Sequence, residues 1–290
     1  MNPRPLPPAL RGQAFTILGG TVAGVSKSRM LRSDLARPTY GVRRDGPPTT
    51  FTDLAAAVAL ALPPDVAFCY STAAGLLDLP LPSDAGPPLH VMRTSEHTRI
   101  RRTGCVGHVG LERRELTFHS GLTLVSPADT FVDLADLPLD DLVILADAIA
   151  TRDSSTESLV KAVARRDRVP ARARAALALA RVGSASPMES HSRLVFQRAG
   201  LPDPELNATL TDESGGWIAT GDFVWRRQRV VVEYQGAHHF GDFDSGDRDI
   251  TRRLLAEDNH WRYVEITKRD VFDEKRRHTM ITRLRRWLVE

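Results

Sequence analysis

Two carboxylates occur in neighbouring segments whose composition is typical of β-strands. Asp222 begins the apolar run 222–225, Glu233 lies in the run 230–236, and the basic segment 226–229 joins the two runs. This pattern predicts a β-hairpin that is buried on at least one face. Because the strands of a hairpin lie side by side, both carboxylates can converge on one point, where they suit a hard divalent cation. We therefore expect a site for Mg²⁺, with Mn²⁺ as the other candidate, that activates water at a phosphodiester.

Glu233 is a stronger candidate metal ligand than Asp222. It follows three consecutive valines, and a carboxylate is costly to bury in such a strand unless a cation or hydrogen-bond donors neutralise it. Asp222 has a simpler alternative, because a single Asp that enters a strand can be an edge or turn residue. The prediction therefore concerns the pair rather than either residue alone.

Several short motifs follow in a fixed order: Glu233-Tyr-Gln235-Gly236, His238-His239, Arg248-Asp249-Ile-Thr-Arg252, Trp261-Arg-Tyr-Val-Glu-Ile266 and Thr267. From Ser186 to the C-terminus the chain thereby resembles the PD-(D/E)XK nuclease superfamily, and within it the very-short-patch-repair-like branch of the DUF559 type. The resemblance implies a restriction-endonuclease-like α/β core, with a central mixed sheet flanked by helices. It also implies a Mg²⁺-dependent endonuclease that acts on DNA.

The resemblance assigns roles to individual side chains. It makes Asp222 and Glu233 the metal ligands, and it places Gln235 where the superfamily has a lysine that orients the attacking water. We favour His238 over His239 as the base or as the holder of a water, since the ordinary pKa of histidine suits proton transfer near neutral pH.

Arg248 and Arg252 share one face of a predicted helix because they are four residues apart. In the nuclease interpretation they bind the scissile phosphate or position Glu233. A solvated row of salt bridges with Asp249 explains the same residues without a ligand.

Glu189 has two interpretations. The first helix of the superfamily often contributes a glutamate to the metal site, and Glu189 stands in that place. Ser186, Pro187 and Glu189 also fit the N-cap, first and third positions of a capping box, which needs no metal. The two roles are compatible.

The departure at Gln235 keeps other functions open. A neutral amide hydrogen-bonds water but supplies no charge. The main alternative is a non-catalytic DNA-binding regulator of antitoxin type with a degenerate nuclease fold. A partner-binding scaffold without affinity for nucleic acid is the third hypothesis, and it predicts no salt-dependent retention on DNA.

The first half of the chain begins with a basic, helix-rich pattern. Residues 13–48 predict two short helices, 13–18 and 21–31, with a turn at Gly19-Gly20 between them. Ser26-Lys-Ser-Arg29 suits a contact between a recognition helix and phosphate. A small helical cap with a solvated basic face is the simpler alternative.

Further motifs of this half match a second family: Tyr40-Gly-Val42, Phe51–Leu62, Tyr70–Pro80, Leu89–Met92, Arg99–Arg102, His108 and Gly121–Ala135. Residues 13–150 thereby resemble the antitoxin-type domain of the AbiEi family, in which the head, residues 13–48, is a degenerate winged helix. Within this region we expect Ser71 to be the N-cap of a helix.

Arg99, Arg101 and Arg102 belong to a basic, β-rich segment. Such a segment can follow a phosphate backbone, which would make DNA the partner of this half as well. A solvated charged face is the alternative, since most charge runs contact only water.

The composition sets the broad class of the protein. A chain of 290 residues with 42 % hydrophobic residues and a net charge of +3 can form two or three domains. Cys69 and Cys105 are too few for a disulfide framework and indicate reduced thiols in a cytoplasmic protein. The longest apolar run, 54–62, is too short to span a bilayer, so we expect no membrane partner. A homodimer is compatible with the sequence, which does not demand one.

The predicted fold class is α/β (α+β). The predicted segments are a proline-rich arm (1–12), an AbiEi-like region with a helical, winged-helix-like head and a mixed β part (13–150), a helical linker (151–185) and a nuclease-like domain (186–290).

Overall fold

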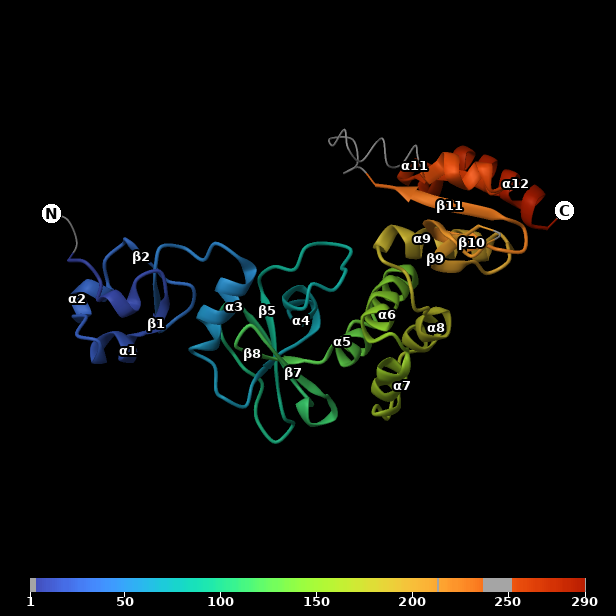
Figure 1. Ribbon diagram of the computed structural model, residues 1–290. Coiled ribbons are helices and arrows are strands. Elements are labelled where there is room, and N and C mark those ends of the chain that lie inside the picture. Colours follow the sequence, from blue (N-terminus) through green and yellow to red (C-terminus); the bar gives the residue numbers. More distant parts are fainter. Residues whose placement is uncertain (1–3, 213, 237–251, 290) are drawn as a thin grey trace. The chain divides into compact units, whose positions relative to one another are not determined.

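The computed structural model has a mixed α+β fold, as predicted (Figure 1). It describes residues 4–212, 214–236 and 252–289. The chain divides into two compact units: Met1–Leu145 with Ser158–Ala175 (unit 1), and Ala146–Glu157 with Ala176–Glu290 (unit 2). In the described residues, no helix is both long and apolar enough to cross a membrane.

The head of unit 1 is built on a three-stranded antiparallel sheet. Its strand order is β1 (Ala14–Thr16), β3 (Val42–Asp45) and β2 (Leu35–Ala36). Two short helices, α1 (Ile17–Val22) and α2 (Lys27–Met30), connect β1 to β2. The small core under them consists of Leu6, Phe15, Val25, Met30 and Leu35.

The two predicted helices of the head are placed wrongly. Residues 14–16 form a strand instead, because Phe15 is buried and pairs with Arg43 of β3. Thr16 is the N-cap of α1, and its Oγ1 accepts a hydrogen bond of 2.9 Å from the N–H of Gly19. The predicted turn at Gly19-Gly20 therefore lies inside α1, where a Cβ on Gly20 would lie 2.8 Å from the sulfur of Met30.

The rest of unit 1 contains a five-stranded mixed sheet with the order β6-β5-β4-β8-β7. Its strands are β4 (Ala67–Phe68), β5 (Leu89–Arg93), β6 (Cys105–Val109), β7 (Leu116–His119) and β8 (Leu122–Val125). Three helices belong to this part: α3 (Phe51–Ala59), α4 (Tyr70–Leu76) and α5 (Pro127–Asp133). The N-cap of α4 is Cys69 and not Ser71, because the helix already begins at Tyr70.

Three helices follow: α6 (Leu139–Asp153), α7 (Glu157–Ala164) and α8 (Ala171–Leu179). The segment predicted as a linker, 151–185, is divided between the units, since 158–175 belongs to unit 1. Ion pairs explain why: Arg165 lies 2.6 Å from Asp129, and Arg166 lies 3.0 Å from Asp133. Both carboxylates are buried in α5, so the arginines hold this segment to unit 1.

Unit 2 contains a four-stranded mixed sheet with the order β12-β11-β10-β9. Its strands are β9 (Glu205–Thr211), β10 (Trp217–Trp225), β11 (Val230–Gln235) and β12 (Arg262–Thr267). β11 pairs antiparallel with β10 and parallel with β12. The expected hairpin of 222–225 and 230–236 is therefore present.

Helices cover both faces of this sheet. One apolar cluster joins Phe223 and Val232 to α9 (Pro187–Arg198), α11 (Lys268–Phe272) and α12 (Glu274–Leu288). A second cluster on Val224 and Val231 includes Ala256 of the helix 252–258. Neighbouring residues of each strand thus point to opposite faces, which is why both strands are apolar almost throughout.

Candidate functional site

Asp222 stands where the ladder between β10 and β11 ends. The last pair on this side is Phe223 with Val232, and Asp222 is the next residue of β10. Its half-buried side chain reaches the neighbouring strand, where Oδ2 accepts a hydrogen bond of 2.7 Å from the backbone N–H of Tyr234. The carboxylate is thereby fixed beside Glu233, the residue that precedes Tyr234.

Gly221 makes this arrangement sterically feasible. An added Cβ would lie 2.3 Å from Cγ2 of the buried Val231, far inside van der Waals contact. Only glycine lets the two strands approach so closely here. Gly221 therefore contributes to the placement of Asp222, its neighbour along β10.

Glu233 is the most buried acid of the hairpin, with 7 % of its surface exposed. It pairs with Glu265 of β12 in the parallel ladder. Two residues earlier on β12 lies Tyr263, whose pKa is raised first by burial and then by the negative charge of Glu233. Glu233 thus lies in the strand interior that the sequence indicates.

Glu189 has contacts that explain it structurally. Ser186 is the N-cap of α9, and its Oγ accepts a hydrogen bond of 3.2 Å from the N–H of Glu189. The Glu189 carboxylate accepts hydrogen bonds from the N–H of Ala185 at 2.8 Å and from Nδ2 of Asn207 at 2.7 Å. In a capping box, the Glu189 carboxylate would accept from the N–H of the N-cap residue, Ser186. Here it accepts from the N–H of Ala185, one residue earlier, and the bond from Asn207 connects it to β9.

Asp222, Glu233 and Glu189, which we call the carboxylate site, interact electrostatically. The pKa of Asp222 is raised to about 7, first by burial. The charges of Glu189 and Glu233 raise this pKa further, while the N–H of Tyr234 and the guanidinium of Arg252 oppose the rise. A cation bound among these acids would relieve both burial and repulsion.

The donor set of the carboxylate site fits a hard divalent cation. Mg²⁺ prefers carboxylate oxygens and is often held by one or two of them, with water at its other positions. In the part of the chain that the structure describes, no group of three or more His, Cys, Asp or Glu side chains is close enough to hold a metal. The fit to Mg²⁺ is therefore one of ligand type, since Asp222 and Glu233 offer carboxylate oxygens.

Gln235 is the last residue of β11, and it pairs with Thr267 of β12. Since side chains alternate along a strand, Gln235 and Glu233 leave β11 on the same side. Arg252 lies in the helix 252–258, and its charge acts on Asp222. The roles of Gln235 toward water and of Arg252 toward phosphate stay predictions.

Three predicted residues fall in a segment for which the structure gives no description. His238, His239 and Arg248 lie outside the described residues. Their roles as base, holder of a water and phosphate ligand stay predictions.

The predicted phosphate ligands of unit 1 differ in their contacts. Arg99 and Arg101 are exposed. The guanidinium of Arg102 instead donates hydrogen bonds to the carbonyls of Tyr40 at 2.8 Å and Ala61 at 2.9 Å, and to Oγ1 of Thr39 at 3.1 Å. These contacts give Arg102 a structural role within unit 1.

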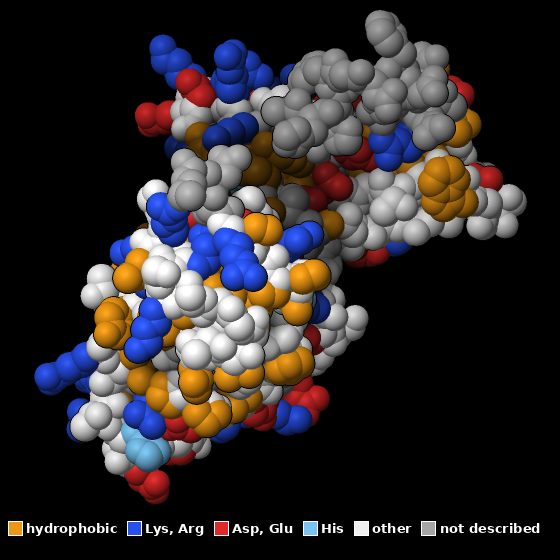
Figure 2. All heavy atoms as spheres, turned by 90° about the vertical axis from the view of Figure 1, so that its left-hand side faces the viewer, with side chains coloured by type: hydrophobic (Ala, Val, Ile, Leu, Met, Phe, Trp, Pro, Cys, Tyr) orange, Lys and Arg blue, Asp and Glu red, His pale blue; other side chains and the backbone are white. Residues whose placement is uncertain are grey.

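The surface of the head is only partly basic. The face in Figure 2 shows hydrophobic side chains exposed between Lys and Arg side chains. In the head, Leu18, Val22 and Tyr40 are 74 %, 82 % and 89 % exposed. The guanidinium of Arg29 lies 2.7 Å from Asp34 and is thereby held within the head. Phosphate binding by residues 26–29 stays a prediction.

A cluster of rings in unit 1 was not predicted. His90 Nδ1 and His108 Nε2 lie 3.0 Å apart, and Tyr70 stacks on His108 with ring centroids 4.2 Å apart. Tyr70 has a φ of 51°, which is rare for a bulky residue. The backbone of His90 holds the residues on either side of Tyr70: its carbonyl accepts a hydrogen bond of 3.1 Å from the N–H of Cys69, and its N–H donates one of 2.8 Å to Oγ1 of Thr72. The sequence shows a histidine in each of two β-rich segments, but it does not show the strand register that brings the two rings together.

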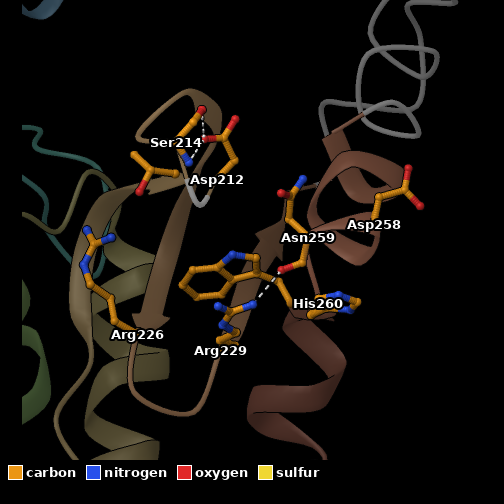
Figure 3. Close-up of a pocket in the computed structure, with 9 residues that line it drawn as sticks. Asp212, Ser214, Arg226, Arg229, Asp258, Asn259 and His260 are labelled. Atoms are coloured by element: carbon orange, nitrogen blue, oxygen red, sulfur yellow. Dashed lines mark hydrogen bonds between the residues drawn. The ribbon is translucent and has the colours of Figure 1, made fainter.

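A separate hollow of about 480 Å³ lies on unit 2 (Figure 3). In it, Nη1 of Arg229 donates a hydrogen bond of 3.3 Å to the carbonyl of Asn259, and Oδ1 of Asp212 accepts one of 2.8 Å from the N–H of Ser214. Its lining consists of Thr211, Asp212, Ser214, Arg226, Arg229, Asp258, Asn259, His260 and Trp261. No residue of the carboxylate site lines it.

Comparisons with known proteins give little guidance to function. The chain is 35 % identical over 86 residues to an uncharacterised protein of Mycobacterium tuberculosis, found in two strains. The matched residues make up 30 % of this chain and 31 % of each relative, so the chain covers about a third of the length of these relatives. No family model and no solved structure matches.

Proposed function

We propose that unit 2 is a metal-dependent endonuclease that hydrolyses phosphodiester bonds of DNA, with a role in DNA repair or defence. The observation that carries the proposal is the hydrogen bond from the N–H of Tyr234 to Asp222, which fixes the Asp222 carboxylate against β11 at the residue that follows Glu233. Two acids held together inside an apolar sheet are unfavourable for stability, and a cation would offset the cost. Their order along the chain and their strand positions are those that the resemblance to the nuclease superfamily implies.

Mg²⁺, when bound by Asp222 and Glu233, would lower the pKa of a water and stabilise developing negative charge on phosphate. The chain's own residues would do the rest. The amide of Gln235 can hydrogen-bond and orient a water. The guanidinium of Arg252, which already acts on Asp222, can neutralise phosphate charge. Glu189 adds negative charge near Asp222 and so favours cation binding.

A non-catalytic DNA-binding regulator is the second candidate. It is favoured by Gln235, which stands in place of a charged lysine, and by the lack of a third acid or histidine ligand in the described residues. This candidate predicts DNA binding that does not depend on Asp222 or on a divalent cation.

Cleavage of supercoiled plasmid separates the two candidates. The matched proteins are the wild type, Asp222→Asn and Glu233→Gln, which keep the shape of each side chain and remove its charge. The nuclease proposal expects nicking by the wild type with Mg²⁺ or Mn²⁺ and none by either variant or in EDTA. Equal gel retardation by all three proteins, with no nicking under any condition, would favour the regulator.

A further inference from the structure

A groove of about 530 Å³ lies at the ends of β11 and β12. Its floor is formed by these strand ends, where Gln235 pairs with Thr267, and α12 forms one wall. Neither Asp222 nor Glu233 lines it, but Gln235 does, and this residue leaves β11 on the same side as Glu233. Its lining consists of Gln235, Val264, Glu265, Ile266, Thr267, Asp270, Lys275, Arg276, Thr279, Met280 and Arg283.

Asp270, one of the two acidic residues of this groove, already has partners. Oδ2 of Asp270 accepts hydrogen bonds from the N–H of Thr267 at 2.8 Å and from its Oγ1 at 2.7 Å. The guanidinium of Arg276 lies 2.9 Å from Oδ1 of Asp270. Glu265 is exposed and makes no ion pair with the described residues. Two cations of the groove also lack an ion pair with the described residues, so the groove keeps a positive net charge.

Lys275 and Arg283 are those cations. Both are exposed, and neither has an ion-pair partner among the described residues. With Thr279 between them they are spaced by four residues, so the three side chains follow one another along α12 over about 12 Å. The Thr279 hydroxyl already donates a hydrogen bond of 3.0 Å to the carbonyl of Lys275, so the two cations are the groups left to bind an anion. Two separated cations suit a chain of repeated negative charges better than a single anion.

We propose that this groove binds the sugar–phosphate backbone of one DNA strand, which Lys275 and Arg283 hold as it passes Gln235 toward the carboxylate site. The proposal rests on the nuclease function proposed above and identifies where its substrate lies. Contacts of this kind position the strand without reading its sequence.

The test measures binding in EDTA, where no cleavage interferes. Lys275→Glu/Arg283→Glu is compared with Arg227→Glu/Arg269→Glu, a pair of exposed arginines that do not line the groove and that give the same change in net charge. The probe is a fluorescent single-stranded oligonucleotide, followed by anisotropy at several salt concentrations. We expect the groove variant to bind at least about tenfold more weakly than the control, with a salt slope lower by about 1.4 for two lost phosphate contacts.

Lys275→Gln/Arg283→Gln, which removes charge without reversing it, should show an intermediate loss, and thermal unfolding establishes that each variant is folded. Equal affinity of the groove and control variants would overturn the proposal, as would the absence of binding by the wild type. Plasmid nicking reports separately on the nuclease. If the wild type never nicks plasmid but the groove variant loses DNA binding, the nuclease proposal fails and the groove proposal stands. If the groove variant nicks normally and binds DNA as the control does, the groove proposal fails and the nuclease proposal stands.

Discussion

The backbone N–H of Tyr234 donates a hydrogen bond of 2.7 Å to Oδ2 of Asp222, across the end of the ladder between β11 and β10. This contact uses one carboxylate oxygen and leaves Oδ1 for another partner. It also fixes the Asp222 carboxylate at the residue that follows Glu233, so the position of this acid depends on the hairpin.

Asp222→Asn tests whether this acid is kept for a cation. The amide oxygen can still accept from Tyr234, while the charge that burial and the neighbouring acids disfavour is gone. We expect the variant to be at least as stable as the wild type in EDTA and to lose the stabilisation that Mg²⁺ or Mn²⁺ gives the wild type. Thermal unfolding with and without the metal measures both effects.

Asp258→Asn is the matched control, since Asp258 is exposed and lies outside the carboxylate site. It should respond to metal as the wild type does. Metal stabilisation of the same size in Asp222→Asn would contradict a metal site at Asp222.

Glu189→Ala should destabilise unit 2 by about 1–3 kcal/mol, because the N–H of Ala185 and the amide of Asn207 lose their acceptor. Glu189→Gln keeps an acceptor oxygen and should cost less. All four tryptophans lie in unit 2, so urea unfolding followed by tryptophan fluorescence reports on this unit. Equal stability of the Ala and Gln variants would show that these hydrogen bonds contribute little.

Gly221→Ala should destabilise unit 2 by about 1–3 kcal/mol, since the new Cβ would meet Val231 and force β10 and β11 apart. Gly86→Ala is the control, because nothing lies within 4 Å of a Cβ at that position. Both are measured by urea unfolding. A Gly221→Ala variant as stable as the wild type would mean that the strands can separate at little cost.

Unit 1 should lose stability in acid because of His108. Burial, and then the charges of His90, Arg99 and Arg114, lowers the pKa of His108 to about 4. Between this value and the ordinary value of about 6.5, the unfolded chain binds a proton that the folded unit does not. The free energy of unfolding therefore falls as the pH is lowered from 6.5 to 4.

His108→Gln should reduce this fall, which far-UV circular dichroism in urea at several pH values can measure. His119→Gln, at an exposed position on β7, is the control. An unchanged pH dependence in His108→Gln would place the acid sensitivity elsewhere.

Strong local patterns predicted the elements of unit 2. The runs of β-branched and aromatic residues predicted the paired parts of β10 and β11. Ser186 is the N-cap of α9 as expected. Each of these elements could be predicted because the residues that determine it are close together in the sequence.

Features that depend on distant residues were missed. Phe15 lies in a strand because β3 pairs with it, and nothing near Phe15 indicates that partner. Likewise, the hydrogen bond from Asn207 to Glu189 and the contacts of Arg102 depend on tertiary packing. Sequence patterns therefore predicted the hairpin that carries Asp222 and Glu233, but they did not predict the tertiary contacts around it.

The rate of plasmid nicking as a function of Mg²⁺ concentration tests the central claim most directly. It is measured for the wild type and for Glu233→Gln, which has the same shape without the charge. The account predicts a wild-type rate that rises with Mg²⁺ to a plateau, and no nicking by the variant at any concentration. Nicking by Glu233→Gln at the wild-type rate, or by the wild type in EDTA, would contradict a metal-dependent nuclease centred on Asp222 and Glu233.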